Sequence, residues 1–438
     1  MSNRLSPAQR SRLANQGAAK TKARPTRSPI RLAGKKENFS TNARQASGRT
    51  LSNLQTIFDR VFKAQSIHFY RLLGVTLFLV GFGVIMVLSA SSIDSLKANN
   101  NSFSIFNKQF FFAVLGLLGM SLISLMPTSF FRSKSSFFFR VALALQVAVF
   151  FIGEEINGNK NWISVFGLFT VQPSEFLKVA VVLFVASHLA SNVDYFYDQS
   201  VWVKALVVSG LAMGAVMVGK DLGTVIIMAI MFIGMMILAG MPQKLITIVV
   251  GIAAVGLPLA LSGSSSRWGR IMAWLNPNAP DPNGYNWQSE HGMWALSAGR
   301  IFGAGLGESK MKWSWIPEVE NDFIFAIIGE ELGLVGALVV ISLFVALAIF
   351  FLNIYNRTAD KFSKYVVGAI MLWVIFQALI NIAVVLRLLP VLGVPLPLIS
   401  AGGSSLVATL AGIGIVLSIE RENHANPAPI NRARPRRR

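Results

Sequence analysis

Three carboxylates stand at the start of, and inside, a strongly apolar segment of the chain. The stretch IPEVENDFIFAIIGEELGLVG places Asp322 directly before the apolar run, and Glu330 and Glu331 lie within it. In a helix, the glutamates would lie roughly 12 Å deeper than Asp322. An ionised side chain at mid-span costs at least ~3 kcal/mol and normally faces a cavity or a partner. Asp322 could be a simple helix cap. We instead expect it at the mouth of a cavity, which Glu330 and Glu331 line unless they hold a neighbouring helix.

A second group of candidates lies around the sequence VQPSEFLK. Pro173 suits the first turn of a helix, and Glu175 and Lys178 are spaced to pair on one helix face. A lysine inside a membrane span needs a partner or a cavity. Lys160 and Trp162 precede this helix, and a cation beside an aromatic ring suits an anionic, sugar-bearing headgroup. Snorkelling at the membrane interface explains that last pair almost as well.

Two further polar positions open apolar runs. Asp221, in KDLGT, is either the cap of the helix that follows or a functional residue, and spacing does not decide between them. Ser404 belongs to a Gly- and Ser-rich cluster, LISAGGSS, that follows three prolines. Irregular backbone of this kind is tolerated in a span where it lines a cavity, and its free amides and hydroxyls can bind an anion. We therefore count both residues as candidate substrate contacts.

The segment 263–321 is the longest stretch without a span-like apolar run, and it holds most of the tryptophans. Its cations stand close in sequence to acidic residues, and cations beside a carboxylate suit diphosphate binding near a general base. From this segment we select Arg270, His291 and Lys312 as candidate substrate contacts. The chain has no G-x-S-x-G, H-E-x-x-H or Walker A motif, which removes support for serine hydrolases, zincins and P-loop NTPases.

The composition indicates a membrane protein. Apolar residues make up 53% of the 438 residues and charged residues only 14%, whereas soluble domains carry roughly 25% charge. The apolar runs are long and do not alternate, so an all-α integral membrane protein is expected rather than a barrel. There is no cysteine, and the four histidines show no metal-ligand spacing, so no metal site is expected. Ten spans are predicted: 70–92, 109–126, 137–154, 173–189, 201–218, 222–239, 245–262, 323–352, 365–388 and 396–419.

Charge sets the predicted topology. Residues 1–66 hold fourteen Lys and Arg against Glu37 and Asp59, and the chain ends in NRARPRRR. We expect a disordered basic tail over 1–66, a ten-helix membrane domain over 67–420 and a second basic tail over 421–438. An even number of spans with basic ends places both termini in the cytoplasm and 263–321, between helices seven and eight, outside. The tails should contact anionic membrane lipids, not nucleic acid, because no folded nucleic-acid-binding module accompanies the charge.

Four motifs in this order resemble the SEDS family, the shape, elongation, division and sporulation proteins. They are GNKNWISVFGLFTVQPSEFLK, DLGT, GAGLGESKMKWSWIPEVENDFIFAIIGEELG and LLPVLGVPLPLISAGGSS. The chain resembles the division members of the family more than the elongation members. The family's essential aspartate corresponds to Asp322, and its span-four glutamate and lysine correspond to Glu175 and Lys178. Lys220 and Arg387 stand where the family more often has proline and a small residue.

The resemblance implies a peptidoglycan glycosyltransferase that polymerises lipid II, a disaccharide-peptide on undecaprenyl diphosphate. It would act at the outer face of the bacterial cytoplasmic membrane, at the division septum, with a class B penicillin-binding protein and other divisome proteins. Transfer from an α-linked donor to a β-linked product inverts the anomeric carbon, which needs a base and cationic help for the leaving diphosphate. Asp322 is the candidate base, and Lys178 and Arg270 are the candidate cations.

Other interpretations of the sequence remain. A divalent cation, Mg²⁺ or Mn²⁺, could share the role of the cations, although no ligand set is defined and no other cofactor is indicated. An elongation-type polymerase and a lipid II flippase or transporter are the alternative functions, and a non-catalytic scaffold is a third. Intramembrane carboxylates and interrupted helices also suit transport. Against transport, the charges gather at one side, and the two halves of the chain show no convincing repeat.

Overall fold

The computed structural model describes residues 65–156, 159–165, 167, 169–262, 265–281 and 283–426. The predicted N-terminal tail lies outside this part except for its last two residues. Of the predicted C-terminal tail, residues 421–426 are described, and the last helix continues through them as far as Ala425. Ser66 caps the first described helix, where its side chain accepts a hydrogen bond from the amide of Phe69.

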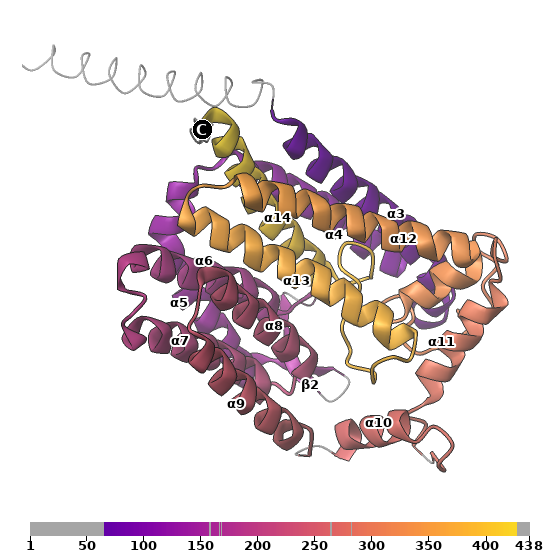
Figure 1. Cartoon of the computed structure of the whole chain (residues 1–438). Coiled ribbons are helices and arrows are strands. Elements are labelled where there is room, and N and C mark those ends of the chain that lie inside the picture. Colours follow the sequence, from indigo (N-terminus) through magenta and orange to yellow (C-terminus); the bar gives the residue numbers. More distant parts are fainter. Residues whose placement is uncertain are drawn as a thin grey trace, which may run out of the picture. The chain divides into compact units, whose positions relative to one another are not determined.

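Helices dominate the described residues (Figure 1). They are α3 (Ile67–Asn99), α4 (Ser104–Leu125), α5 (Thr128–Ile152), α6 (Pro173–Ser191), α7 (Gln199–Val218), α8 (Leu222–Ala239), α9 (Gln243–Ser262), α10 (Ser265–Leu275), α11 (Trp287–Ala298), α12 (Ile324–Arg357), α13 (Lys361–Val385) and α14 (Gly403–Ala425), with a short 3₁₀ turn at Val193–Tyr195. Nine of these helices are long and apolar enough to cross a membrane. A helix satisfies its own backbone hydrogen bonds, which lipid cannot do. The chain is thus a multi-pass helical membrane protein.

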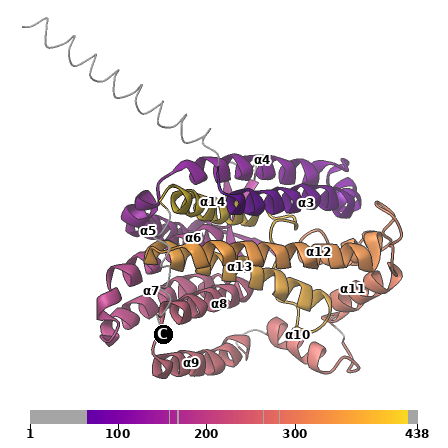
Figure 2. The same cartoon turned by 45° about the horizontal axis from the view of Figure 1, so that its top comes forward.

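The seventh predicted span, 245–262, forms α9, a helix of 20 residues from Gln243 to Ser262. This helix packs against α8 and α10 and lies at the edge of the bundle (Figure 2). The interior belongs instead to α13 and α14, in which 67% and 78% of the apolar window is buried, against 22% for α5. Close packing of α14 on α4 requires small residues, since a side chain at Gly414 would come 2.8 Å from the carbonyl oxygen of Met120.

The loop after α5 contains a small sheet, which differs from the purely helical expectation. Strands β1 (Glu154–Ile156), β2 (Asn159–Val165) and β3 (Phe169–Val171) pair antiparallel in that order. Ser164 lies opposite Thr170 across the turn that contains Gly167, whose φ is +68°. Aromatic and β-branched residues on either side of a turn glycine are a hairpin signal, and NWISVFGLFTV carries that signal.

Two predicted spans have different bounds in the structure. The tenth span begins at Gly403 instead of 396, because the prolines before it cannot continue a helix and Leu398 adopts φ +66°. The eighth span is one long segment, α12, but it breaks at Gly333, where φ is +68° and ψ is −167°. A glycine permits this backbone without steric cost.

The loop that follows α11 supplies hydrogen-bond partners for the backbone groups at the break in α12. The amides of Ala304 and Gly305 donate to the carbonyls of Glu330 and Glu331, at 2.9 and 3.0 Å. The amide of Leu334 donates in turn to the carbonyl of Arg300 at 2.9 Å, and that of Val335 to Ile301 at 3.1 Å. Backbone groups freed by a break in a membrane helix must be paired in this way. The loop is therefore bonded into the helix at its broken turn.

Candidate functional site

Three connections enclose a cavity at one end of the bundle, which we call the loop end. They are the strands between α5 and α6, the segment between α9 and α12, and the segment between α13 and α14. The cavity has a volume of about 1080 Å³. Five of the residues selected from the sequence line it: Trp162, Glu175, Asp221, Arg270 and Asp322. The structure brings these five residues to one cavity, although they come from four distant parts of the chain.

The backbone that carries Asp322 is fixed by donors from the opposite wall. The amide of Ala401 donates to the carbonyl of Glu320 at 2.9 Å, and the Ser400 hydroxyl donates to the carbonyl of Asn321 at 2.5 Å. The Nδ2 atom of Asn381, on α13, donates to the carbonyl of Asp322 at 2.8 Å. Three consecutive carbonyls are thus held by hydrogen bonds from α13 and the segment after it.

The same wall is itself held in place. Gln109 of α4 donates through Nε2 to the carbonyl of Ser400 at 3.1 Å and accepts from the amide of Gly402 at 3.2 Å. Asn381 donates a second hydrogen bond to the carbonyl of Val394 at 2.7 Å. Gln109 and Asn381 are almost fully buried. Side chains locked by packing and by second hydrogen bonds hold a functional group more accurately than a loop alone does.

The electrostatic setting of Asp322 suits proton exchange near neutral pH. Its pKa is raised to about 7, chiefly by burial and then by the Glu318 carboxylate, while the Arg270 guanidinium acts in the opposite direction. Asp322 is only partly exposed, and burial disfavours the charged form of an acid. Burial also raises the pKa of Glu320, which lines the same cavity, to about 7. A general base works best when its pKa lies near the working pH.

Asp221 is a helix cap that also lines the cavity, and its role as a substrate contact stays a prediction. Its Oδ1 accepts from the amide of Thr224 at 3.0 Å at the start of α8. Its Oδ2 accepts from Nε2 of Gln172 at 2.8 Å. Burial raises the pKa of Asp221 above its ordinary value, against the effect of its hydrogen bonds to Thr224.

Glu175 and Lys178 form the pair that the spacing predicts. Lys178 Nζ donates to Glu175 Oε1 at 2.9 Å, and both side chains are buried in α6. The Lys178 ammonium also lies 4.6 Å from the ring centroid of Trp373, within the range of a cation–π contact. Glu175 lines the cavity and Lys178 does not. Lys178 therefore lies behind Glu175, and the structure does not bring it to the cavity as a direct substrate contact.

Four other selected residues lie outside the walls of this cavity. Lys160 donates through Nζ to the carbonyl of Phe150, at 2.9 Å, near the end of α5. Ser404 is buried, and its hydroxyl accepts from the amide of Gln172 at 3.1 Å. His291 is buried beneath three tryptophans of the long loop, and its Nδ1 bonds to the carbonyl of Trp287 at 2.9 Å. Lys312, the fourth, belongs to a separate cluster. Because these four residues do not line the cavity, its geometry does not support the prediction that they contact the substrate.

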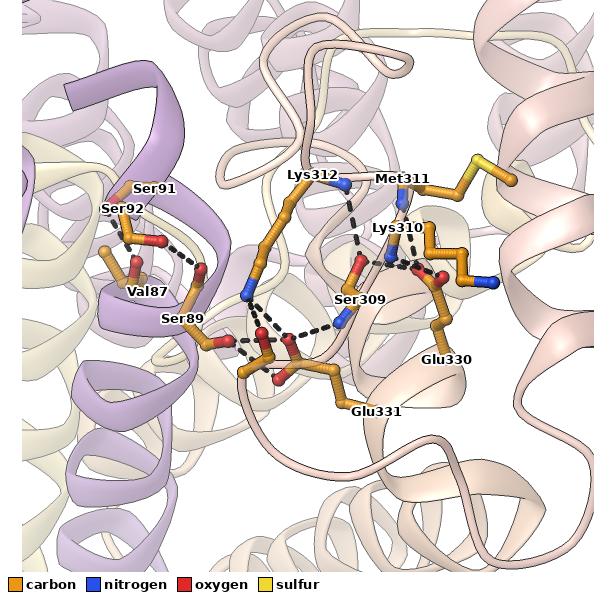
Figure 3. Close-up of polar contacts among 11 residues, drawn as sticks. Val87, Ser89, Ser91, Ser92, Ser309, Lys310, Met311, Lys312, Glu330 and Glu331 are labelled. Atoms are coloured by element: carbon orange, nitrogen blue, oxygen red, sulfur yellow. Dashed lines mark hydrogen bonds and ion pairs between the residues drawn. The ribbon is translucent and has the colours of Figure 1, made fainter. Parts of the chain in front are cut away.

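Glu330 and Glu331 also lie away from the cavity, so the expectation that they line it is not met. Figure 3 shows both carboxylates directed at the loop that follows α11. Glu330 accepts from the amide of Lys310 at 2.8 Å and from the hydroxyl of Ser309. Glu331 pairs with Lys312 Nζ at 3.5 Å and accepts from the hydroxyl of Ser89 at 2.6 Å. Because Ser89 belongs to α3, Glu331 agrees with the alternative of holding a neighbouring helix, whereas Glu330 holds only the loop.

Several residues of the site were missed by the sequence reasoning. Glu318 and Glu320 line the cavity, and Gln109, Asn381 and Ser400 fix its wall. Gln109 and Asn381 were detectable in principle, since each is a polar residue in an apolar run that must find a buried partner. In the described part of the chain, no group of three or more His, Asp and Glu residues is arranged to hold a metal ion. We therefore assign no chemical step to Mg²⁺ or Mn²⁺.

A bundle of membrane-spanning helices with a buried acid in a polar cavity at one end defines a multi-pass membrane protein with an enzyme-like site. The chain belongs to the FtsW/RodA/SpoVE family of cell cycle proteins, whose model matches residues 70–425.

Individual relatives agree with this family, and one solved structure has the same fold. The chain is 35% identical over 414 residues to the probable peptidoglycan glycosyltransferase FtsW of Mycobacterium tuberculosis, covering 94% of this chain and 78% of that protein. It is 35% identical over 355 residues to the stage V sporulation protein E of Bacillus subtilis, covering 79% and 95%. A chain solved in a study of polymerization and crosslinking by a peptidoglycan synthase complex has the same fold, with a TM-score of 0.68 and 23% identity, covering 83% and 99%.

Proposed function

We propose that this protein is a peptidoglycan glycosyltransferase of the division type, which polymerises lipid II with Asp322 as the general base. The observation that carries the proposal is the fixed position of Asp322 inside the cavity, with its pKa near neutrality. The names of its relatives support the reaction class and favour division over elongation. We further propose that the loop end faces the outside of the cytoplasmic membrane, at the septum.

The reaction requires one proton transfer and one displacement. The 4-hydroxyl of the acceptor sugar attacks the anomeric carbon of the donor, and its proton passes to the Asp322 carboxylate. A new C–O bond forms while the bond from the anomeric carbon to the diphosphate oxygen breaks, and the diphosphate leaves with the bonding electrons. Arg270 lines the same cavity and supplies positive charge for that leaving group. Attack from the opposite face inverts the configuration from α to β.

Asp322 is a better base than its neighbour Glu320, although both have a pKa of about 7. A base must be ionised before it accepts a proton. The equal pKa values do not separate the two groups, and the backbone carbonyls of both are held. The choice rests on Arg270, the proposed leaving-group cation, which acts on the Asp322 carboxylate.

The partner of this enzyme, on our proposal, is a class B penicillin-binding protein that cross-links the new strands. The structural neighbour from a peptidoglycan synthase complex supports a partner of this kind. Full activity should therefore need both proteins in one membrane, together with the other divisome proteins in the cell.

The test is glycan polymerisation from lipid II by the purified protein, with and without its cognate penicillin-binding protein. Asp322→Ala and Asp322→Asn should make no polymer, while Asp198→Asn, a change of an exposed aspartate in another loop, should leave polymerisation intact. Polymer from Asp322→Asn at the wild-type rate would overturn the assignment of the base. Movement of lipid II across vesicles without any polymer from the wild type would identify a transporter instead.

A further inference from the structure

A second, smaller cavity adjoins the one that contains Asp322. Its volume is about 320 Å³, and the two cavities share five lining residues: Asn159, Asp221, Arg270, Val391 and Gly393. The smaller cavity lies between the turn before α8, the helix α10 and the segment after α13. A molecule that occupies both cavities must pass across the shared wall.

The two cavities carry opposite charge. Among the described residues, the larger one is lined by six carboxylates, on Glu154, Glu175, Asp221, Glu318, Glu320 and Asp322, and by two cations, on Lys108 and Arg270. The smaller one, which we call the basic pocket, is lined by three cations, Lys220, Arg267 and Arg270, and by one carboxylate, that of Asp221. Burial raises the pKa of Asp221, which lines both cavities, and raises those of Glu320 and Asp322 to about 7, while Lys178 neutralises Glu175. The larger cavity thus carries less negative charge than six carboxylates imply, but a dianionic group is still favoured beside the three cations of the smaller one.

The backbone around Lys220 is held in place by hydrogen bonds from both sides. Lys220 has φ +63°, which is uncommon for a lysine. Such a backbone conformation persists only where the surrounding structure imposes it. Arg267 donates through Nη2 to the carbonyl of Lys220, and Asn161 donates through Nδ2 to the carbonyl of Gly219 at 2.8 Å. Asp221 is fixed by Gln172 and Thr224 on the other side. The turn is therefore preorganised, and it fixes the Cα atom of Lys220 at the edge of the basic pocket.

We propose that the basic pocket binds the diphosphate of a prenyl-diphosphate-linked donor, with Lys220 as a diphosphate contact, while the acceptor sugar occupies the acidic cavity. This inference rests on the proposed function and divides its site into two subsites. The rest of the pocket wall is largely apolar, including Leu222, Ile271 and Leu392, which suits the first units of a prenyl chain.

The junction of the two cavities lies next to the proposed base. Gly393 lines both cavities, and a side chain at Gly393 would come 3.6 Å from Oδ2 of Asp322. A sugar attached to a diphosphate in the basic pocket therefore enters the acidic cavity at the point where Asp322 faces it. This arrangement places the anomeric carbon between the leaving group and the base.

Binding of undecaprenyl diphosphate to the full-length protein in nanodiscs tests the inference without turnover. Lys220→Asn removes the charge and keeps a residue that tolerates a positive φ. Lys220 is exposed on one side, so we expect the dissociation constant to rise about three- to tenfold, less than for a buried charged contact. Lys220→Arg should bind as the wild type does. Lys310→Asn removes an exposed cation outside both cavities and should also bind normally. Unfolding temperatures verify that each variant is folded.

The outcomes separate this inference from the proposed function. Asp322→Asn should bind undecaprenyl diphosphate with wild-type affinity and make no polymer. Unchanged binding by Lys220→Asn, or an equal loss in Lys220→Asn and Lys310→Asn, would overturn the diphosphate subsite and leave the glycosyltransferase proposal standing. Undecaprenol, which has the same chain and no phosphate, should show no difference between Lys220→Asn and the wild type. A difference with undecaprenol would assign Lys220 to the lipid chain and contradict the inference.

Discussion

Replacing Asn381 by alanine tests whether the position of Asp322 is set from α13. Asn381 is almost fully buried, and its Nδ2 atom donates to the carbonyls of Asp322, at 2.8 Å, and Val394, at 2.7 Å. Two net hydrogen bonds of about 1 kcal/mol each are lost, and leaving buried carbonyls unpaired adds to this cost. We therefore expect Asn381→Ala to lower the free energy of unfolding by about 2–4 kcal/mol.

The effect on catalysis should exceed what the stability loss explains. A displacement of about 1 Å at a reacting group costs on the order of 10²-fold in rate. Without the Asn381 hydrogen bond the Asp322 carbonyl is free to shift, so kcat for lipid II polymerisation should fall by about that factor while KM changes little. The assay is initial-rate polymerisation on lipid II at a temperature at which the variant is folded.

Gln377 supplies a matched control on the same helix. It lies one turn before Asn381, and its Nε2 donates to the carbonyl of Pro395, in the same segment, at 3.0 Å. It makes no hydrogen bond to the loop of Asp322. Gln377→Ala should thus lose comparable stability and keep most of its kcat. Equal losses of kcat in the two variants, or wild-type kcat in Asn381→Ala, would refute the positioning role of Asn381.

Three further predictions concern titration and the loop attached to α12. Because the pKa of Asp322 is raised to about 7 and a base acts when deprotonated, kcat/KM should rise with pH up to about 7 and then level off. Arg270→Gln should move that inflection to higher pH, since Arg270 lowers the pKa; an unmoved inflection in the pH–rate profile would assign the titration to another group. Gly333→Ala should lower the free energy of unfolding by at least about 1 kcal/mol. The reason is that φ is +68° and a side chain would come 2.4 Å from backbone atoms. A melting temperature equal to that of the wild type would contradict this reasoning. Lys312→Met should destabilise by about 3–5 kcal/mol, because it leaves the Glu331 carboxylate buried and unpaired. The double variant with Glu331→Gln should recover part of that loss in chemical denaturation, and no recovery would argue against the pair.

The sequence was informative where a residue's position along a helix restricts what its side chain can reach. Asp221 and Asp322 stand at helix starts, and Glu175 stands in a first turn, so all three were expected at the end of the bundle where they lie. The spacing of Glu175 and Lys178 implied their ion pair for the same reason. Local geometry of this kind depends only on the helix period, which the apolar pattern reveals.

The sequence was uninformative where a contact depends on loops that fold back. Lys312 and His291 were selected for their charge and their ring, yet one neutralises Glu331 and the other packs among tryptophans. The break at Gly333 could not be inferred either, because a glycine inside a span is usually explained by close helix packing. Only the matching backbone of residues 300–305 makes that break stable.

The broken turn of α12 gives the long loop mechanical leverage on the site. The loop is bonded to the helix on both sides of Gly333, so tension on residues 300–312 cannot be absorbed by slack in that loop. Residues 324–332 form a short rigid rod, with this anchor at one end and Asp322 just beyond the other. We therefore expect a molecule that binds to the loop to influence the position of the Asp322 carboxylate through this helical segment.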